Sequence, residues 1–129
     1  MPTIAPDYLH ATYRPDLSIL VGRWMRSVET AELRSGYASL LTKAEEQACP
    51  FWLLDTRRRL TVEQADIHWM MEEFYPLVFS RLRQTVYFAF LLAPNQLTEV
   101  LANPSLPPLS YFDGRPYQVE RFIDERLAA

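Results

Sequence analysis

Two kinds of apolar pattern alternate along this chain, and the alternation limits the folds that the chain can adopt. Several short segments are rich in β-branched and aromatic residues and lie between turn-forming residues, which is typical of strands. The predicted strands are Tyr8–Tyr13, Leu17–Trp24, Phe51–Asp55, Thr85–Leu92 and Leu109–Phe112. Because the turn signal Arg14-Pro15-Asp16 separates the first two, we expect them to form an antiparallel hairpin.

Between these strands the apolar residues repeat at helical spacing. From Ser27 the pattern predicts a long helix that ends at Pro50, with Glu29 and Glu32 near the positive end of its dipole. Its inner face is expected to carry Leu33, Tyr37, Leu40, Leu41, Ala44 and Ala48.

A second helix is predicted to start at the quartet Thr61-Val62-Glu63-Gln64, which matches a capping box. Its inner face is expected to carry Ile67, Met70, Met71, Phe74, Leu77 and Val78. Pro76 lies inside this pattern and should kink or divide the helix, because proline lacks the amide hydrogen that a helix interior uses.

The last third of the chain is rich in proline, which divides it into short pieces. We expect a helix from Pro94 to about Ala102, followed by an extended linker over Asn103–Pro108. The strand Leu109–Phe112 and a turn at Asp113-Gly114 should come next. A final helix is predicted to start at Pro116, and its apolar face would carry Val119, Phe122, Ile123 and Leu127.

The predicted order of elements is β-β-α-β-α-β-α-β-α. Strands that alternate with helices call for a mainly parallel sheet with right-handed crossovers, to which the opening hairpin adds one antiparallel strand. We therefore expect residues 1–129 to form a single α/β domain with a mixed, mostly parallel sheet of about five strands.

The three glycines exclude several large enzyme classes. They lie at positions 22, 36 and 114, so the chain holds no GxGxxG fingerprint, no phosphate-binding loop and no GxSxG nucleophile elbow. The net charge of −3 also argues against general nucleic-acid binding, which uses a basic face.

The remaining composition indicates an ordinary intracellular protein. The longest apolar stretch, Val86 to Ala93, is much shorter than the roughly 20 residues of a membrane helix, and residues 1–7 do not have the pattern expected of a signal peptide. We therefore expect a cytoplasmic location without membrane contact. Cys49 is the single cysteine and is expected to be a small buried residue, so neither a disulfide nor a cofactor is predicted.

Three local patterns resemble the STAS family, the sulfate-transporter and anti-sigma-factor-antagonist domain, and especially its small stand-alone bacterial members. They are the strand end Val21-Gly22-Arg23-Trp24, the apolar strand Trp52-Leu53-Leu54-Asp55 before a helix, and Tyr111-Phe112-Asp113. The resemblance implies a non-enzymatic regulatory domain that binds a protein partner. It also implies a phosphorylation site at Thr56, because anti-sigma-factor antagonists carry a phosphorylated serine after the matching aspartate.

The loop after Asp55 is the first place to look for a ligand, since open α/β sheets bind ligands outside the carboxyl ends of their parallel strands. Arg57, Arg58 and Arg59 precede a predicted helix start and could form an anion site with its free amides. The alternative is that the three arginines lie in a solvent-exposed turn and balance the charge of nearby acidic residues. The many aromatic residues, Trp69 among them, could form the core, an interface or an apolar pocket.

Two histidines complete the set of candidates. His68 and Glu72 lie four residues apart on the second predicted helix, the spacing at which an imidazole and a carboxylate can meet, but two ligands do not make a metal site. His10 lies in the opening strand without a predicted partner.

We therefore carry three functional hypotheses. The first is a non-catalytic, STAS-like regulatory domain that binds a protein partner or a second copy of itself. The second is a small-molecule carrier or sensor that holds an apolar or anionic ligand near Asp55, Thr56, Arg57, Arg58, Arg59 and Trp69. The third, more remote, is an enzyme that uses His68 with Glu72.

Overall fold

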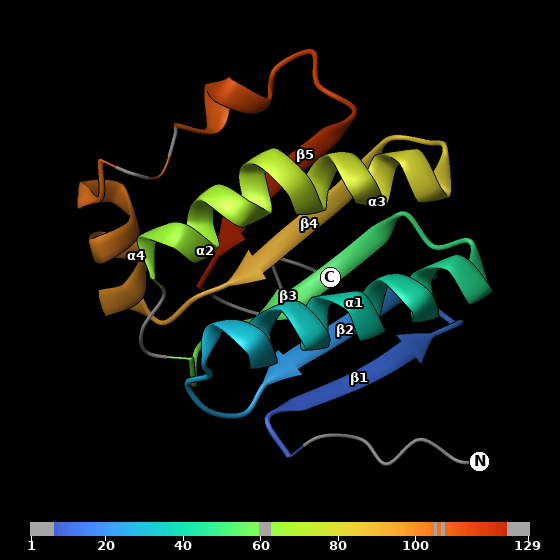
Figure 1. Cartoon of the computed structure of the whole chain (residues 1–129), viewed down its shortest axis with the longest axis horizontal. Coiled ribbons are helices and arrows are strands. Elements are labelled where there is room, and N and C mark those ends of the chain that lie inside the picture. The colour runs from blue at the N-terminus through green and yellow to red at the C-terminus, as the bar shows by residue number, and fades with distance from the viewer. Residues whose placement is uncertain (1–6, 60–62, 105, 107, 124–129) are drawn as a thin grey trace.

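Five strands form one sheet in the computed structural model, and their spatial order is their order in the chain (Figure 1). The structure describes residues 7–59, 63–104, 106 and 108–123. The strands are β1 (Leu9–Arg14), β2 (Ile19–Trp24), β3 (Phe51–Asp55), β4 (Val86–Leu91) and β5 (Tyr117–Phe122). The first two pair antiparallel and the other neighbours pair parallel, which confirms the hairpin and the mostly parallel α/β sheet.

Helices connect the parallel strands. They are α1 (Thr30–Gln47), the continuous series α2 (Gln64–Trp69), η1 (Met70–Phe74) and α3 (Tyr75–Leu82), and then α4 (Pro94–Ala102) and η2 (Leu109–Phe112). The bounds of α4 are those that the sequence predicts. Of the predicted capping box, Thr61 and Val62 lie outside the described residues, and α2 begins at Gln64 with Glu63 as its N-cap.

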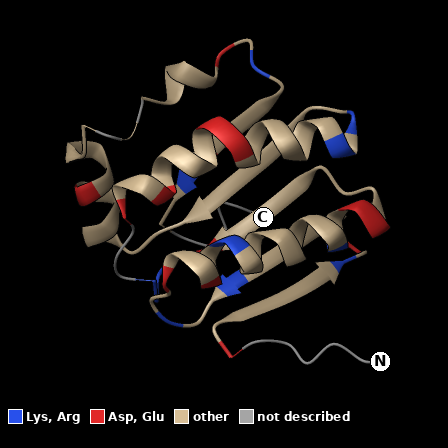
Figure 2. Cartoon of the chain, viewed as in Figure 1, with Lys and Arg blue, Asp and Glu red and all other residues tan. Residues whose placement is uncertain are grey.

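The two long helical segments cover one face of the sheet (Figure 1). The parallel strands follow one another in a single direction across the sheet, and right-handed crossovers in one direction place their helices on the same side. Within the described ranges, the far face of the sheet has no helix. The two long helical segments carry charged residues of both signs (Figure 2).

A π-helical turn, η1, separates α2 from α3 just before Pro76. Proline lacks an amide hydrogen, and the residues before it form a π-helical turn. Pro76 was predicted to kink or divide the helix; the winding changes here, but the helical series continues through Pro76. Such a turn holds one residue more than an α-helical turn and rotates the residues that follow it. Tyr75 is therefore buried, and Leu77, which the α-helical period places on the inner face, is 42% exposed.

The α1 inner face follows the prediction except at its end. Leu33, Tyr37, Leu40, Leu41 and Ala44 are buried, together with Gly36. Ala48 is instead exposed, because it adopts a left-handed conformation (φ 48°) that ends the helix before Pro50.

The structure corrects the prediction for the C-terminal part. Leu109–Phe112 is a 3₁₀ turn rather than a strand, and Tyr117–Phe122 is a strand rather than the start of a helix. Tyr117 and Val119 are buried and lie two residues apart, which is the period of a strand, and this segment pairs with β4 along its whole length. The final residues of the predicted helix, 124–129, lie outside the described residues. The predicted turn is confirmed, and Gly114 has a φ of 76°.

Aromatic rings fill the space between the sheet and the helices. Ring centroids lie 5.2 Å apart for Trp24 and Tyr37, 4.9 Å for Tyr37 and Phe74, and 6.0 Å for Phe74 and Trp52. The chain of contacts continues from Trp52 through Phe88, Tyr75 and Phe112. Most of the aromatic side chains therefore form the core, as one of the sequence interpretations holds.

Gly36 shows how tightly α1 packs on this core. A β-carbon at this position would lie 2.6 Å from Cη2 of the buried Trp24 ring and 3.2 Å from Cδ2 of Leu9. A Gly36→Ala variant gains about 1 kcal/mol of helix propensity, but overpacking a rigid core costs roughly 1–3 kcal/mol. We expect its free energy of unfolding, measured by urea denaturation, to fall below that of the wild type.

The control is Ser35→Ala, which changes the exposed neighbour in the same helix. Its free energy of unfolding should stay within about 0.5 kcal/mol of the wild-type value. A Gly36→Ala protein as stable as the wild type would contradict the packing described here.

Candidate functional site

Asp55, the last residue of β3, lies between two arginines. Its Oδ2 accepts hydrogen bonds from Arg23 Nη1 at 2.9 Å and from Arg57 Nη2 at 2.8 Å, and its Oδ1 accepts from Arg57 Nε at 3.0 Å. Burial raises the pKa of Asp55, but the hydrogen bonds from Arg57 and Arg23 outweigh burial, so the pKa lies below its ordinary value. Asp55 is therefore an ion-paired carboxylate that fixes the start of the loop.

Thr56 turns inward at the end of β3. It is 4% exposed, and both its backbone N–H and its hydroxyl donate to the carbonyl of Leu91, at 3.0 Å and 3.2 Å. In this arrangement a kinase would reach the hydroxyl only after the loop opened. Phosphorylation of Thr56 stays a prediction.

The three consecutive arginines have separate environments. Arg57 pairs with Asp55, and Arg58 is exposed, so these two fit the interpretation as a solvated turn. Arg59 is only 8% exposed. Its guanidinium lies 5.1 Å from the Trp24 ring centroid, and its Nη1 donates to the Tyr37 hydroxyl at 3.4 Å. The three arginines are therefore adjacent in the sequence, but the fold places their side chains in different environments.

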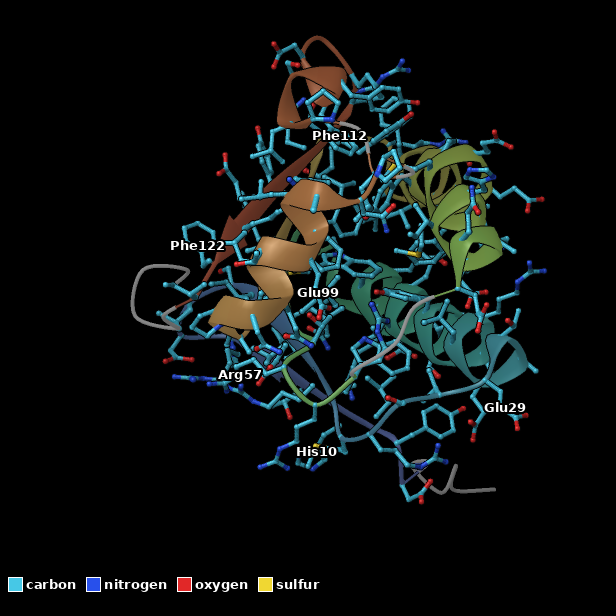
Figure 3. All side chains as sticks on the ribbon, turned by 90° about the vertical axis from the view of Figure 1, so that its left-hand side faces the viewer. His10, Glu29, Arg57, Glu99, Phe112 and Phe122 are labelled. Atoms are coloured by element: carbon cyan, nitrogen blue, oxygen red, sulfur yellow. The ribbon has the colours of Figure 1, made fainter. Side chains whose placement is uncertain are left out.

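Gln96 on α4 holds this loop in place. Its Nε2 donates to the carbonyls of Thr56 at 2.9 Å and Arg59 at 3.1 Å, while its Oε1 accepts from the backbone N–H of Ala93 at 2.8 Å. Figure 3, turned so that α4 faces the viewer, shows Arg57 on the loop beside this helix. Because the amide is 8% exposed, these bonds are protected from competition with water.

A cavity of about 210 Å³ opens beside this loop, between α1, α2 with η1, α4 and the carboxyl ends of the parallel strands. It lies where open α/β sheets hold their ligands. Its walls are mainly apolar, and they include Ile67, Met70, Met71, Phe90, Val100 and Val119.

Four charged side chains also line the cavity: Arg59, Asp66, Glu99 and Arg121. Arg59 Nε and Asp66 Oδ1 are buried and have no hydrogen-bond partner among the described residues. Asp66 is 3% exposed. Leaving a buried polar atom unpaired costs about 1–3 kcal/mol, so these two atoms need an explanation.

Tyr75 lies against the same cavity. Burial raises the pKa of its hydroxyl, with a further contribution from Tyr37. Burial also lowers the pKa of Arg121, a change that its interaction with Tyr75 opposes. Both shifts reflect a partly dry environment, in which electrostatic contacts are stronger than in water.

The other residues singled out from the sequence lie elsewhere. Trp69 does not line the cavity; it stacks on Phe74 at 5.2 Å and lies below the Arg34 guanidinium. His68, Glu72 and His10 are exposed, while Cys49 is buried, as predicted. In the described part of the chain, no group of three or more His, Cys, Asp or Glu side chains could hold a metal ion.

Sequence reasoning missed Asp66, Gln96 and Arg121. A signal for Asp66 exists, because it lies next to Ile67 and four residues before Met70, on the buried side of the helix. Gln96 lies three residues after Ala93, the spacing of a capping glutamine. Arg121 could not be placed, because its segment was predicted to be a helix.

Comparisons with protein-family models, with curated proteins and with solved structures find no match. Among the helices that the structure describes, none is both long enough and apolar enough to cross a membrane.

The pairing of Asp55 can be tested through pH. Its folded pKa is lowered, so its contribution to stability is present above its ordinary pKa of 3.8 and is lost as the pH falls through the folded pKa. At neutral pH we expect Asp55→Asn to lower the free energy of unfolding by about 1–2 kcal/mol, because its two arginines are partly exposed. Urea denaturation at several pH values measures this difference.

The difference between Asp55→Asn and the wild type should shrink in acid. Asp113→Asn, at an exposed turn position, provides the control and should leave stability nearly unchanged at neutral pH. A difference for Asp55→Asn that stays constant from neutral to acid pH would show that the carboxylate charge contributes nothing.

Proposed function

We propose that this domain binds a small, largely apolar molecule in the cavity between α2–η1, α4 and the sheet, and that it acts as a carrier or sensor rather than as a catalyst. One observation carries the proposal: a mainly apolar cavity of about 210 Å³ lies at the carboxyl ends of the parallel strands, and the charged side chains of Arg59 and Asp66 are among its lining residues. Ligand sites commonly combine apolar walls with a few convergent polar groups in this way.

The size of the cavity limits the ligand. A dry engineered cavity of about 150 Å³ accepts benzene, and sites for drug-sized ligands occupy roughly 300–1,000 Å³. The cavity of about 210 Å³ lies between these values. It therefore suits a molecule with one ring or a short branched chain.

The cavity chemistry supports binding more than catalysis. Nucleophilic catalysis by a hydroxyl requires a base within hydrogen-bond reach. The Thr56 hydroxyl donates to the Leu91 carbonyl instead, and the Tyr37 hydroxyl accepts from Arg59. Within the described ranges, neither hydroxyl forms a hydrogen bond with Asp66, so neither is paired with that carboxylate as a base.

The methionines provide a direct test. Met70 and Met71 line the cavity, whereas Met25, directly after β2, is 38% exposed and is not among the lining residues. In protein labelled with ¹³C at the methionine methyl groups, titration with toluene should shift the Met70 and Met71 signals and leave the Met25 signal in place. Toluene is neutral, so this test depends on the apolar cavity alone.

A matched pair of variants completes the test. Val100→Trp puts a large ring into the cavity from α4 and should abolish the toluene-dependent methionine shifts. Leu101→Trp places the same ring at a position that is 72% exposed, so the methionine shifts should remain. Absence of toluene-dependent shifts in the wild type, or equal shifts in both variants, would refute binding in this cavity.

A second candidate function uses the far face of the sheet. Phe51 and Tyr87 are neighbours across β3 and β4 on this face, with rings stacked 5.2 Å apart, and they are 46% and 44% exposed. Ile19, Ala89 and Phe122 are partly buried around a smaller apolar cluster nearby. An exposed aromatic pair of this kind is common in protein interfaces. This face would serve the regulatory, protein-binding role that the resemblance to STAS domains implies, with a second copy as the first partner to test.

Sedimentation equilibrium tests this second candidate. If two copies pair through the far face, the average mass of the wild type should rise above 15.1 kDa with concentration. Phe51→Lys/Tyr87→Lys should remain at 15.1 kDa, whereas Leu77→Lys, a similarly exposed position on the helical side, should behave as the wild type. A wild-type protein that stays monomeric at every concentration would exclude self-association through this face.

A further inference from the structure

Resting on the proposed function, we infer that the ligand of the cavity is a small apolar carboxylic acid, bound as its carboxylate. Arg121 on β5 would hold the carboxylate, and the apolar walls beside Met70 and Phe90 would hold the rest of the molecule. This inference gives the proposed ligand a charge and a head group, and it assigns the head group to a single side chain.

The pleat of β5 directs Arg121 toward the cavity. Val119 is buried in the core and lines the cavity, and Arg121 lies two residues further along the same strand. Side chains two residues apart in a strand lie on the same face of the sheet. Arg121 therefore lies on the cavity side of β5, and it is itself one of the residues that line the cavity.

Arg121 is a partly buried cation without an anion. Of the arginines that the structure describes, only Arg23, Arg59 and Arg121 are not exposed. Arg23 pairs with Asp55 at 2.9 Å, and the Arg59 guanidinium lies 5.1 Å from the Trp24 ring centroid. Arg121 has no ion pair and no hydrogen bond with any described residue. A cation that is taken out of water without a partner is costly, and the planar guanidinium fits the two oxygens of a carboxylate.

The guanidinium of Arg121 is within reach of a molecule in the cavity. Among the described residues, three side-chain polar atoms are fully enclosed without a hydrogen bond, namely Trp24 Nε1, Arg59 Nε and Asp66 Oδ1. The nitrogens of Arg121 are not enclosed in this way, although none of them has a hydrogen bond there, so they keep accessible surface. Arg121 therefore offers its charge at the surface of the cavity.

The electrostatic surroundings of Arg121 favour an anion. Burial lowers the pKa of Arg121, and within the described ranges only the Tyr75 hydroxyl opposes this shift. Burial raises the pKa of Tyr75, and both Arg59 and Arg121 oppose that rise. Asp66 and Glu99 also line the cavity, but neither acts on Arg121 or on Tyr75. This part of the cavity therefore has two cations and no acid in its vicinity, which favours a carboxylate over an ammonium group.

The walls and the volume limit the rest of the molecule. Met70 and Met71 are flexible and polarizable, and Ile67 and Phe90 add apolar surface. A cavity of about 210 Å³ suits a phenyl ring or a branched alkyl chain with a short link to the carboxylate. The probes that we select are therefore 3-phenylpropanoate and 4-methylpentanoate.

Two probe series on the wild-type protein test the charge of the ligand without any variant. The first compares 3-phenylpropanoate with 3-phenylpropanamide, which has nearly the same shape but no charge, and with 3-phenylpropylamine, which is a cation. The second compares 4-methylpentanoate with 4-methylpentanamide and 4-methylpentylamine. Affinities come from titration calorimetry at neutral pH, and the methyl signals of Met70 and Met71 locate the binding.

In at least one series the carboxylate should bind about tenfold or more tightly than the amide and the amine, because a charged hydrogen bond adds to the same apolar contacts. If neither carboxylate binds, or if the amide or the amine equals the carboxylate in both series, the inference is wrong. Toluene binding would then show that the proposed apolar cavity stands without it. The absence of binding by toluene and by every probe would overturn both.

Variants assign the carboxylate to its residue. Arg121→Met removes the charge but keeps an unbranched side chain, and it should weaken the tighter-binding carboxylate about tenfold while the toluene-dependent methionine shifts remain.

Two controls accompany this variant. Arg58→Met removes an exposed arginine, and Glu99→Gln removes an acid from the same lining; neither should weaken the carboxylate. Thermal denaturation establishes that each variant is folded. A folded Arg121→Met protein that binds the carboxylate as tightly as the wild type would contradict the assignment. If Arg121→Met does not fold, the probe series on the wild-type protein still decides the inference.

Discussion

Between the sheet and its long helices, aromatic rings pack in an unbroken chain of contacts from Trp24 to Phe112. These rings set the distance between the sheet and the helices. The Trp24 ring also sets how closely α1 packs, because it lies directly against Gly36. Arg59 is buried because its guanidinium can lie on the Trp24 ring, where the ring's electrons attract a cation. The cavity lies beside this chain of rings, and Tyr37 and Tyr75 line it together with methionine, valine and leucine side chains.

Much of the fold was predictable from local pattern. Apolar periodicity and the positions of Pro50 and Pro94 correctly predicted the hairpin, α1, β3, β4 and α4. In these segments the local preference for helix or strand agrees with the structure that the whole fold requires. The segment after Pro116 was predicted wrongly, because Val119, Phe122 and Ile123 satisfy a helical period and the pairing of β5 with β4 is a long-range contact. The change of the buried face after η1 could not be predicted either, because Pro76 indicates that the helix is interrupted but not that the interruption is a π-helical turn.

The site was less predictable than the fold. The loop after Asp55 could be located, because a strand that ends before a helix places its loop at the carboxyl edge of the sheet. What each arginine contacts depends on residues that are distant in sequence: Arg57 meets Asp55 beside Arg23, while Arg59 meets Trp24. The chain offers no local signal for which of its arginines the fold will bury. Trp69 was expected beside the ligand, but its ring packs against Tyr37 and Arg34 of α1 instead.

The amide of Gln96 connects the start of α4 with the loop after β3, because its Nε2 donates to two loop carbonyls while its Oε1 accepts from the N-cap residue of α4 itself. The loop and α4 both line the cavity, and they cannot separate without breaking these two bonds, which are shielded from water. For the proposed ligand, the rate of exchange with solvent would then depend on how often these bonds break, so residence time and affinity become separate properties. A change at position 96 would alter the residence time more than the fit of the ligand's shape.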